Sequence, residues 1–210
     1  MSRENVLHKV RTALGRSAGQ PVAPVPPVRL RVPEMDVASR IARFSEALDA
    51  LAGKAYRASS VDDARAYVAA LVEGKTAVAS NSPYLAECGI TALAGVRTGF
   101  TAEPELRQLC ATADFGITSA DYALADTGTL VLLSSPREAR MISLVPPAHI
   151  ALIQRECILT GLDELVTLLP LPADRTSSMV LITGPSRTAD IEQILLRGVH
   201  GPGEIHVVIV

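Results

Sequence analysis

The 210 residues suffice for one large α/β domain, or for one domain with an N-terminal extension. An apolar fraction of 48% beside 20% charged residues predicts a packed core and excludes a chain that is disordered throughout. Aromatic residues make up only 3%, and the net charge is −2. The chain therefore lacks both the stacking platform and the basic surface that nucleic-acid binding requires, so we expect no nucleic-acid partner.

The three cysteines are too scattered to indicate a disulfide scaffold, an iron–sulfur cluster or a cysteine-rich zinc site. Cys88, Cys110 and Cys157 show no C-x-x-C spacing, and isolated cysteines of this kind usually pack as small apolar residues. The histidines also lack the spacing of metal ligands, so no metal site is predicted. The sequence contains neither a membrane-span pattern nor a secretory signal, and we therefore expect a cytoplasmic protein.

Residues 1–15 predict a short amphipathic helix, because Val6, Val10 and Leu14 recur at helical spacing among charged residues. Prolines within residues 16–34 are incompatible with a helix or a central strand and predict an extended linker. The main domain is therefore expected over residues 35–210. The tethered helix either docks on this domain or is offered to a partner, because a helix this short is marginal unless it packs.

The first part of the domain is expected to alternate helices with short strands. Asp36 and Ser60 are predicted to cap two helices, which end near Gly53 and Gly74. Strands are predicted at residues 55–58 and 76–80, and a further short helix begins at Pro83.

From residue 112 onward the pattern changes to include antiparallel strands. Residues 122–125 and 129–134 flank Thr127-Gly128 and predict a hairpin. Further apolar runs occupy residues 141–145 and 149–153, and a Thr160 capping box precedes a helix to Leu169. A strand at 179–183, a loop, a helix to Arg197 and a strand at 204–210 complete an α/β fold with a mixed sheet flanked by helices.

The loop after residues 179–183 is the strongest local indication of a binding site. A helix start, two hydroxyls and a guanidinium together favour a carboxylate or phosphate ligand. The residues concerned are Gly184, Ser186, Arg187, Thr188 and Asp190. The alternative is that the hydroxyls only cap the helix and that Arg187 is solvated.

Three further positions are candidates for polar chemistry. Asp126, followed by Thr127, Gly128 and Thr129, offers a carboxylate base beside a turn, although turn geometry alone favours the same residues. His149 follows two prolines and is either an acid–base group or a buried structural histidine. His200 lies beside Gly201 in a glycine-rich turn, from which it could reach a ligand held by the Arg187 loop.

Four segments in the C-terminal half resemble the signature of the lactate-utilisation (LUD) domain family. They read GITSADYALADTGTLVL at residues 116–132, SLVPPAHI at 143–150, GPSRTADIE at 184–192 and GVHGP at 198–202. They occur in the family's order, and the resemblance extends over roughly residues 36–210. It implies the mixed α/β fold of the sugar-phosphate isomerase and CoA-transferase superfamily.

The resemblance is to the short form of the family, which lacks iron–sulfur motifs. It implies a subunit without cofactors that works with two iron–sulfur partner proteins in oxidising L-lactate to pyruvate. In this interpretation Arg187 and the helix start bind the lactate carboxylate, with Asp126, His149 or His200 near its hydroxyl. Two alternatives remain open. One is a free-standing enzyme or binding protein for a phosphosugar or acyl-CoA. The other is a non-catalytic regulator or assembly factor, which the Asp126 in place of the family's usual glutamate favours.

Overall fold

The computed structural model describes residues 2–17, 19–21, 35–189 and 195–210. The chain divides into two compact units, Met1–Arg31 and Val32–Val210, and each is described by itself. The first contains the helix that the sequence predicts, α1 (Arg3–Ala13), whose first turn is capped by Ser2. No residue of α1 is buried within this unit. Asp190, one of the predicted site residues, lies outside the described residues.

Both predicted capping residues begin helices of the second unit. Asp36 accepts a hydrogen bond of 2.7 Å from the Ser39 amide at the start of α2 (Val37–Ala50). Ser60 accepts one of 3.1 Å from the Asp63 amide at the start of α3 (Val61–Val72). Each side chain satisfies a backbone donor that would otherwise lack a partner at the helix end.

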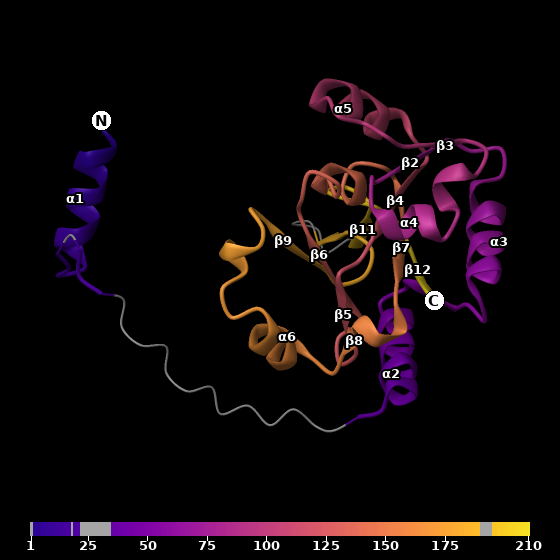
Figure 1. The fold of residues 1–210 in the computed structure, drawn as a ribbon, viewed down its shortest axis with the longest axis horizontal. Coiled ribbons are helices and arrows are strands. Elements are labelled where there is room, and N and C mark those ends of the chain that lie inside the picture. The colour runs from indigo at the N-terminus through magenta and orange to yellow at the C-terminus, as the bar shows by residue number, and fades with distance from the viewer. Residues whose placement is uncertain (1, 18, 22–34, 190–194) are drawn as a thin grey trace. The chain divides into compact units, whose positions relative to one another are not determined.

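A six-stranded sheet forms the centre of the second unit, with strand order β1-β12-β7-β4-β2-β3 (Figure 1). The strands are β1 (Lys54–Arg57), β2 (Ala77–Ala79), β3 (Val96–Arg97), β4 (Phe115–Ser119), β7 (Ala148–Ile153) and β12 (Glu204–Ile209). Every neighbouring pair is parallel. The carboxyl ends of all six strands therefore meet at one edge of the sheet, where open α/β sheets usually bind ligands.

A second sheet has four strands in the order β8-β5-β6-β9, with β5 (Tyr122–Leu124), β6 (Thr129–Leu133), β8 (Ile158–Leu159) and β9 (Met179–Ile182). This sheet is mixed, because β6 is antiparallel to both β5 and β9, whereas β8 is parallel to β5. The predicted hairpin is confirmed as the antiparallel β5–β6 pair. The expected α/β class, with helices flanking the sheet, is also confirmed, and the main sheet is parallel.

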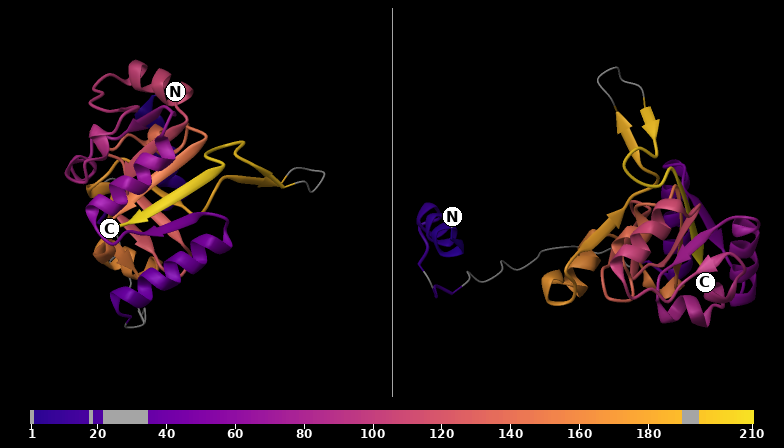
Figure 2. Two further views of the ribbon diagram at one scale, coloured as in Figure 1. Left: turned by 90° about the vertical axis from the view of Figure 1, so that its right-hand side faces the viewer. Right: turned by 90° about the horizontal axis from the view of Figure 1, so that it is seen from above.

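The predicted helix that ends at Arg197 is wrong. Its place is taken by a two-stranded antiparallel ribbon of β10 (Arg187–Ala189) and β11 (Leu195–Arg197). Figure 2 shows this ribbon projecting away from the six-stranded sheet. The apolar residues of a short hairpin also satisfy a helical spacing, so periodicity alone could not separate the two.

Two smaller predictions are also corrected. The first part of the apolar run at residues 141–145 lies in a 3-10 helix, η2 (Arg140–Ser143), which Leu144 caps. The capping residue of α6 (Leu162–Leu168) is Gly161 rather than Thr160, and the Thr160 hydroxyl has no hydrogen-bond partner. The remaining short helices are α4 (Pro83–Glu87), α5 (Glu103–Thr112), η1 (Ile90–Ala92), η3 (Arg155–Cys157) and η4 (Pro172–Asp174).

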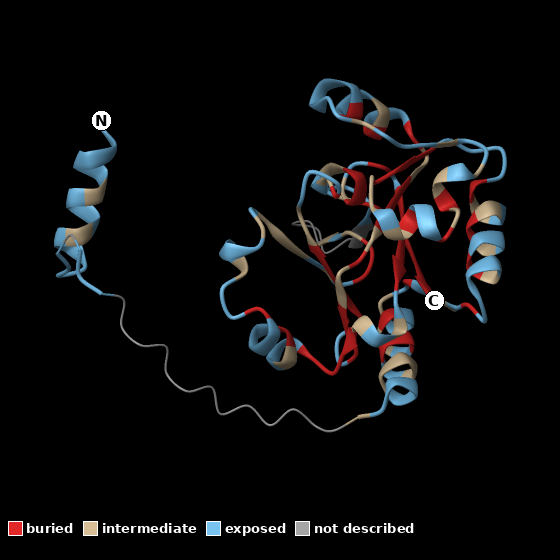
Figure 3. Cartoon of the chain, viewed as in Figure 1, coloured by how far each residue is buried: buried red, intermediate tan, exposed pale blue. Residues whose placement is uncertain are grey.

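The central sheet is covered on both faces, and most of its strands are buried (Figure 3). Helices α3 and α4 pack on one face, against side chains such as Ile117, Ile150 and Val208. Helix α2 and the second sheet pack on the other, around Phe44 and Leu48. Helix α5 and η2 cover that same face at β2, and α6 covers the outer side of the second sheet.

Among the described residues, no helix is long and apolar enough to span a bilayer.

Candidate functional site

The predicted Thr127-Gly128-Thr129 segment forms the β5–β6 turn and joins a chain of hydroxyl groups. The Thr127 and Thr129 hydroxyls are 2.8 Å apart, and the Thr129 hydroxyl lies 2.9 Å from that of Thr183 at the end of β9. These contacts connect the turn to the start of the Gly184–Thr188 loop. The structure thus brings together two segments that the sequence analysis proposed separately.

Gly128 allows this turn to pack directly on α2. Its φ angle is 65°, and a Cβ atom at this position would lie 2.5 Å from the Leu48 amide nitrogen. Asp126, beside it, is exposed and accepts a 3.2 Å hydrogen bond from the Thr127 hydroxyl. Turn geometry and helix packing therefore account for the glycine at this position.

Arg187 contacts the C-terminal end of α2 rather than standing at a helix start. Its guanidinium donates to the carbonyl of Leu51, the residue that caps α2, and Gly184 packs on the Leu51 side chain. A cation at a helix C-terminus is electrostatically favourable. Because β10 occupies this position, the helix-start amides that were expected to bind an anion are absent from the described residues.

The Ser186 and Gly201 segments also meet. The Ser186 amide donates to the Pro202 carbonyl at 2.8 Å, and Gly201 faces the Ser186 side chain. Thr188 is partly buried in β10, and His200 is exposed. Their roles in ligand binding stay predictions.

His149 lies inside the sheet, on β7, and is completely buried. Its Nε2 atom is 2.7 Å from the Thr118 hydroxyl, whereas Nδ1 has no hydrogen-bond partner. Burial lowers the pKa of His149 to about 4, so the ring is neutral near pH 7. No hydrogen bond among the described residues joins His149 or His200 to Asp126.

A polar cluster that sequence reasoning missed surrounds Glu138. This carboxyl group is buried, with the residue only 8% exposed. Its Oε2 atom accepts a 2.7 Å hydrogen bond from the Ser80 hydroxyl and a longer one, 3.4 Å, from the Ser119 amide. Its Oε1 atom is also buried but has no hydrogen-bond partner. An unpaired buried oxygen is unfavourable, and a bound water or a ligand at this position would supply the missing contact.

Burial, together with the charge of Asp121, raises the pKa of Glu138 to about 8, although the hydrogen bonds from Ser80 and Ser119 lower it. The pKa of Asp121 is itself raised by burial, although the Leu133 amide donates to this carboxyl at 2.7 Å. Glu138 is therefore largely protonated near pH 7 and can donate a hydrogen bond as well as accept one.

The cluster lies at a point of the sheet where successive strand connections pass over opposite faces. Ser80 follows β2 and Ser119 ends β4, so both stand at the carboxyl ends of adjacent parallel strands. The connection from β2 to β3 contains α4, which packs on one face, while the connection from β3 to β4 contains α5, which packs on the other. Such a topological switch point is the usual position of a binding crevice in an open α/β sheet.

Two cavities adjoin this cluster. One, of about 610 Å³, lies between residues 134–140 and residues 175–178 and is lined by Glu138, Arg140, Arg175 and several hydroxyl groups. The other, of about 220 Å³, includes Asn81 and Arg137 in its lining. Within the described part of the chain, these three arginines form no ion pair with an acidic side chain. The cavities are therefore suited to a small anion.

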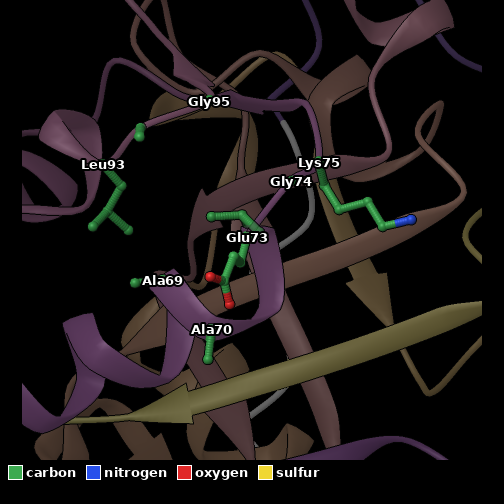
Figure 4. A pocket seen from close by; sticks show the side chains of 9 residues that line it. Ala69, Ala70, Glu73, Gly74, Lys75, Leu93 and Gly95 are labelled. Carbon is green, nitrogen blue, oxygen red and sulfur yellow. The ribbon is translucent and has the colours of Figure 1, made fainter.

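A cavity of about 630 Å³ at the end of α3 has a different character (Figure 4). Its lining consists mainly of alanine, glycine and other apolar residues, and Glu73 and Lys75 are the charged residues among them. In Figure 4 the Lys75 side chain extends away from Leu93. Because ligand sites bring several polar groups together, the Glu138 cluster is the stronger candidate.

The cysteines are buried or partly buried. Cys88 and Cys110 lie in the core and Cys157 is partly exposed. Burial raises the pKa of Cys110 to about 11, and it raises the pKa values of the other two thiols as well. Their expected packing role is confirmed for Cys88 and Cys110.

No group of three His, Cys, Asp or Glu side chains among the described residues could hold a metal ion.

The structure is thus an α/β domain with the Glu138 cluster, a candidate site, at the carboxyl edge of a parallel sheet. The sequence model of the LUD domain matches residues 41–210, and the chain therefore belongs to the LUD domain family. The family resemblance seen in the sequence is thus confirmed.

Similar proteins agree with this assignment. A "Lactate utilization protein C" of Halalkalibacterium halodurans is 45% identical over 94 residues, which cover 43% of this chain and 41% of that protein. Another, of Exiguobacterium sp., is 38% identical over 115 residues, covering 52% and 50%. This chain thus spans half or less of the length of these relatives. A crystal structure of a DUF162 family protein from Deinococcus radiodurans shares the fold, with a TM-score of 0.64 at 18% identity, over 84% of this chain and 99% of that one.

Proposed function

We propose that this chain is a cytoplasmic component of a lactate-utilisation system that oxidises L-lactate to pyruvate, and that it binds a small anion without carrying an iron–sulfur cluster of its own. Family membership and relatives named lactate utilization protein C support the pathway. The observation that carries the binding role is the arginine-lined cavity beside the buried Glu138 carboxyl.

In this proposal the clusters that accept the electrons belong to two partner proteins. Oxidation of L-lactate to pyruvate releases two electrons and two protons, so an acceptor is needed. Cluster ligation requires thiolates, which the raised pKa values of Cys88, Cys110 and Cys157 disfavour. These cysteines are therefore better suited to packing than to ligation.

Removal of the gene from its native cells tests the proposal. Growth with L-lactate as the sole carbon source should be lost, while growth with pyruvate should be retained, because only the oxidation step is missing. Restoring the gene should restore growth. Unimpaired growth on L-lactate without the chain would contradict the role in lactate utilisation.

Anaerobic affinity purification from lactate-grown cells tests the partners. The chain should co-purify with two cysteine-rich, iron-containing polypeptides, and the eluate should reduce a dye when L-lactate is added. A colourless, inactive chain would instead favour the free-standing alternative. Binding of a phosphosugar and of an acyl-CoA to the purified chain would then be measured by titration. Both ligands carry phosphate groups, which the arginines of the cavity can bind.

A further inference from the structure

We propose that Glu138, Arg140 and Arg175 form a binding site for a 2-hydroxycarboxylate and its 2-oxo product, in which the arginines hold the carboxylate and Glu138 hydrogen-bonds to the oxygen on carbon 2. This inference rests on the proposed function, because L-lactate and pyruvate are the members of this class in question. It assigns the ligand to a different place from the Arg187 loop.

The orientation of the Glu138 carboxyl is fixed on one side. The Ser80 hydroxyl and the Ser119 amide both donate to Oε2, at 2.7 and 3.4 Å. These donors come from the ends of two adjacent strands of the rigid sheet. The other oxygen, Oε1, has no partner, and a buried polar atom without a partner is unfavourable. A ligand oxygen would complete the hydrogen bonding of this carboxyl group.

The proton of Glu138 belongs on Oε1, because Oε2 already accepts two hydrogen bonds. Burial raises the pKa of this group to about 8, which keeps the proton in place near pH 7. The charged groups around it are Asp121, whose charge contributes to this raised pKa, and Arg137, Arg140 and Arg175 in the adjoining cavities. A protonated Oε1 can donate to the hydroxyl oxygen of lactate or to the keto oxygen of pyruvate.

The two arginines approach the cavity from separate segments. Arg140 begins η2, and Arg175 follows η4, as the residue that caps it. Hydrogen bonds hold these walls together: the Thr176 hydroxyl donates to the Ser134 carbonyl at 2.8 Å, and the Ser134 amide donates to the Ser178 carbonyl at 2.9 Å. Guanidinium groups bind carboxylates through paired hydrogen bonds, so two of them in one cavity favour a carboxylate ligand.

The cavity is large enough for the ligand, but its access to Glu138 Oε1 is restricted. At about 610 Å³ it has room for lactate and for a neighbouring group of a partner protein. Glu138 lines this cavity, but Oε1 is covered by protein atoms. A ligand that hydrogen-bonds to Oε1 therefore has to displace the protein atoms that cover this oxygen.

Calorimetric titration of the full chain with L-lactate and with pyruvate at pH 7 tests the inference. Replacing Glu138 by alanine, or Arg140 or Arg175 by alanine, should weaken binding of both ligands by about tenfold or more, because a hydrogen bond to a charged or protonated group is lost. Glu138→Gln should retain binding, since the amide keeps the size and the donor of the protonated acid. Glu105→Gln and Arg43→Ala, both exposed and outside the cavity, are the matched controls.

The pH dependence gives a second readout that a purely structural role of Glu138 would not produce. Wild-type affinity should decrease above about pH 8 as the carboxyl group ionises, whereas Glu138→Gln should show no such decrease. Circular dichroism confirms that each variant is folded before titration.

Three results would overturn the inference. These are no binding of L-lactate or pyruvate by the wild-type chain, equal affinities for wild type and all three alanine variants, and binding of a sugar phosphate in place of both ligands. The proposed function is tested separately by growth. If cells producing Glu138→Ala grow on L-lactate as the wild type does, while cells without the chain do not, the site is wrong and the pathway assignment stands.

Discussion

Among single residues, Glu138 and His149 are both buried and both keep one polar atom without a hydrogen-bond partner. Burial moves their pKa values in opposite directions, to about 8 for Glu138 and about 4 for His149. Both groups are thus held neutral near pH 7, because the protein interior disfavours charge. This shared behaviour leads to a prediction about the pH dependence of stability.

The free energy of unfolding should decrease as the pH rises from 6.5 to 8.5. Up to about pH 8 the folded chain retains the Glu138 proton that the unfolded chain has already released, so rising pH favours unfolding by up to about 1.4 kcal/mol per pH unit, and this dependence levels off at higher pH. Below pH 6.5, His149 acts in the opposite direction, because its lowered pKa means that the unfolded chain binds the extra proton. Urea unfolding at several pH values measures this dependence.

Variants isolate the contribution of Glu138 to this pH dependence. Glu138→Gln should flatten the decrease between pH 6.5 and 8.5, because an amide does not ionise. Glu105→Gln, on the exposed surface of α5, should leave the wild-type slope unchanged. If Glu138→Gln keeps the full wild-type slope, Glu138 is not the group that titrates.

Sequence reasoning reached His149 but not Glu138, for a physical reason. His149 follows two prolines and begins an apolar run, so its position at a strand was predictable. Glu138 stands in the segment Ser-Ser-Pro-Arg-Glu, whose composition is that of an exposed loop. Its burial depends on contacts with Ser80 and Ser119, which are 58 and 19 residues away in the chain. No local pattern records such contacts.

At the scale of elements, the β5–β6 turn shows how a site-like motif serves packing. Gly128 combines a left-handed backbone with direct contact to the α2 backbone at Ala47 and Leu48. Gly74 has a similar φ angle, 67°, but open space around its Cα atom. Substituting each glycine therefore distinguishes two effects: at Gly74 only the backbone conformation is strained, whereas at Gly128 a side chain would also collide with α2.

Gly128→Ala should destabilise the protein more than Gly74→Ala. The Gly74 variant carries only the left-handed strain, about 1–2 kcal/mol, whereas the Gly128 variant adds about 1–3 kcal/mol for displacing α2. Chemical denaturation of both variants measures the difference. Equal losses for the two variants would show that α2 does not press on the turn.

The elements themselves were predicted unevenly. Helix caps at Asp36 and Ser60 and the β5–β6 hairpin were correct, because each depends on hydrogen bonds between residues close in sequence. The ribbon of β10 and β11 was predicted as a helix, and the run at residues 141–145 was not recognised as part of η2. For short apolar segments the surrounding structure decides between helix and strand, and local spacing does not.

At the scale of the whole molecule, the α/β class was predictable from the alternation of helices and strands, whereas the division into a six-stranded sheet, a four-stranded sheet and the β10–β11 ribbon was not. Strands β5 and β6 pair locally, but β8 pairs with β5 at a separation of 35 residues and β9 pairs with β6 at separations of 46 to 52 residues. Which strands share a sheet thus depends on long-range pairing, and the position of the Glu138 cluster at the switch point follows from that pairing.

Removal of residues 1–34 should leave the α/β domain intact. Among the described residues, the buried side chains begin at Phe44, and α1 buries none of its own. The shortened chain should therefore unfold within about 0.5 kcal/mol of the full chain in urea. Removal of residues 1–44 is the matched control and should abolish cooperative unfolding, because it takes Phe44 and half of α2 from the core.

A larger loss on removing residues 1–34 would contradict this independence. If the fold is retained, the same truncation addresses the function of the N-terminal segment. Val6, Val10 and Leu14 of this segment are exposed, and the sequence left open whether they dock on the chain's own domain or on a partner. With stability unchanged, loss of co-purifying iron-containing proteins would assign residues 1–34 to partner binding, and their retention would place that contact on the α/β domain.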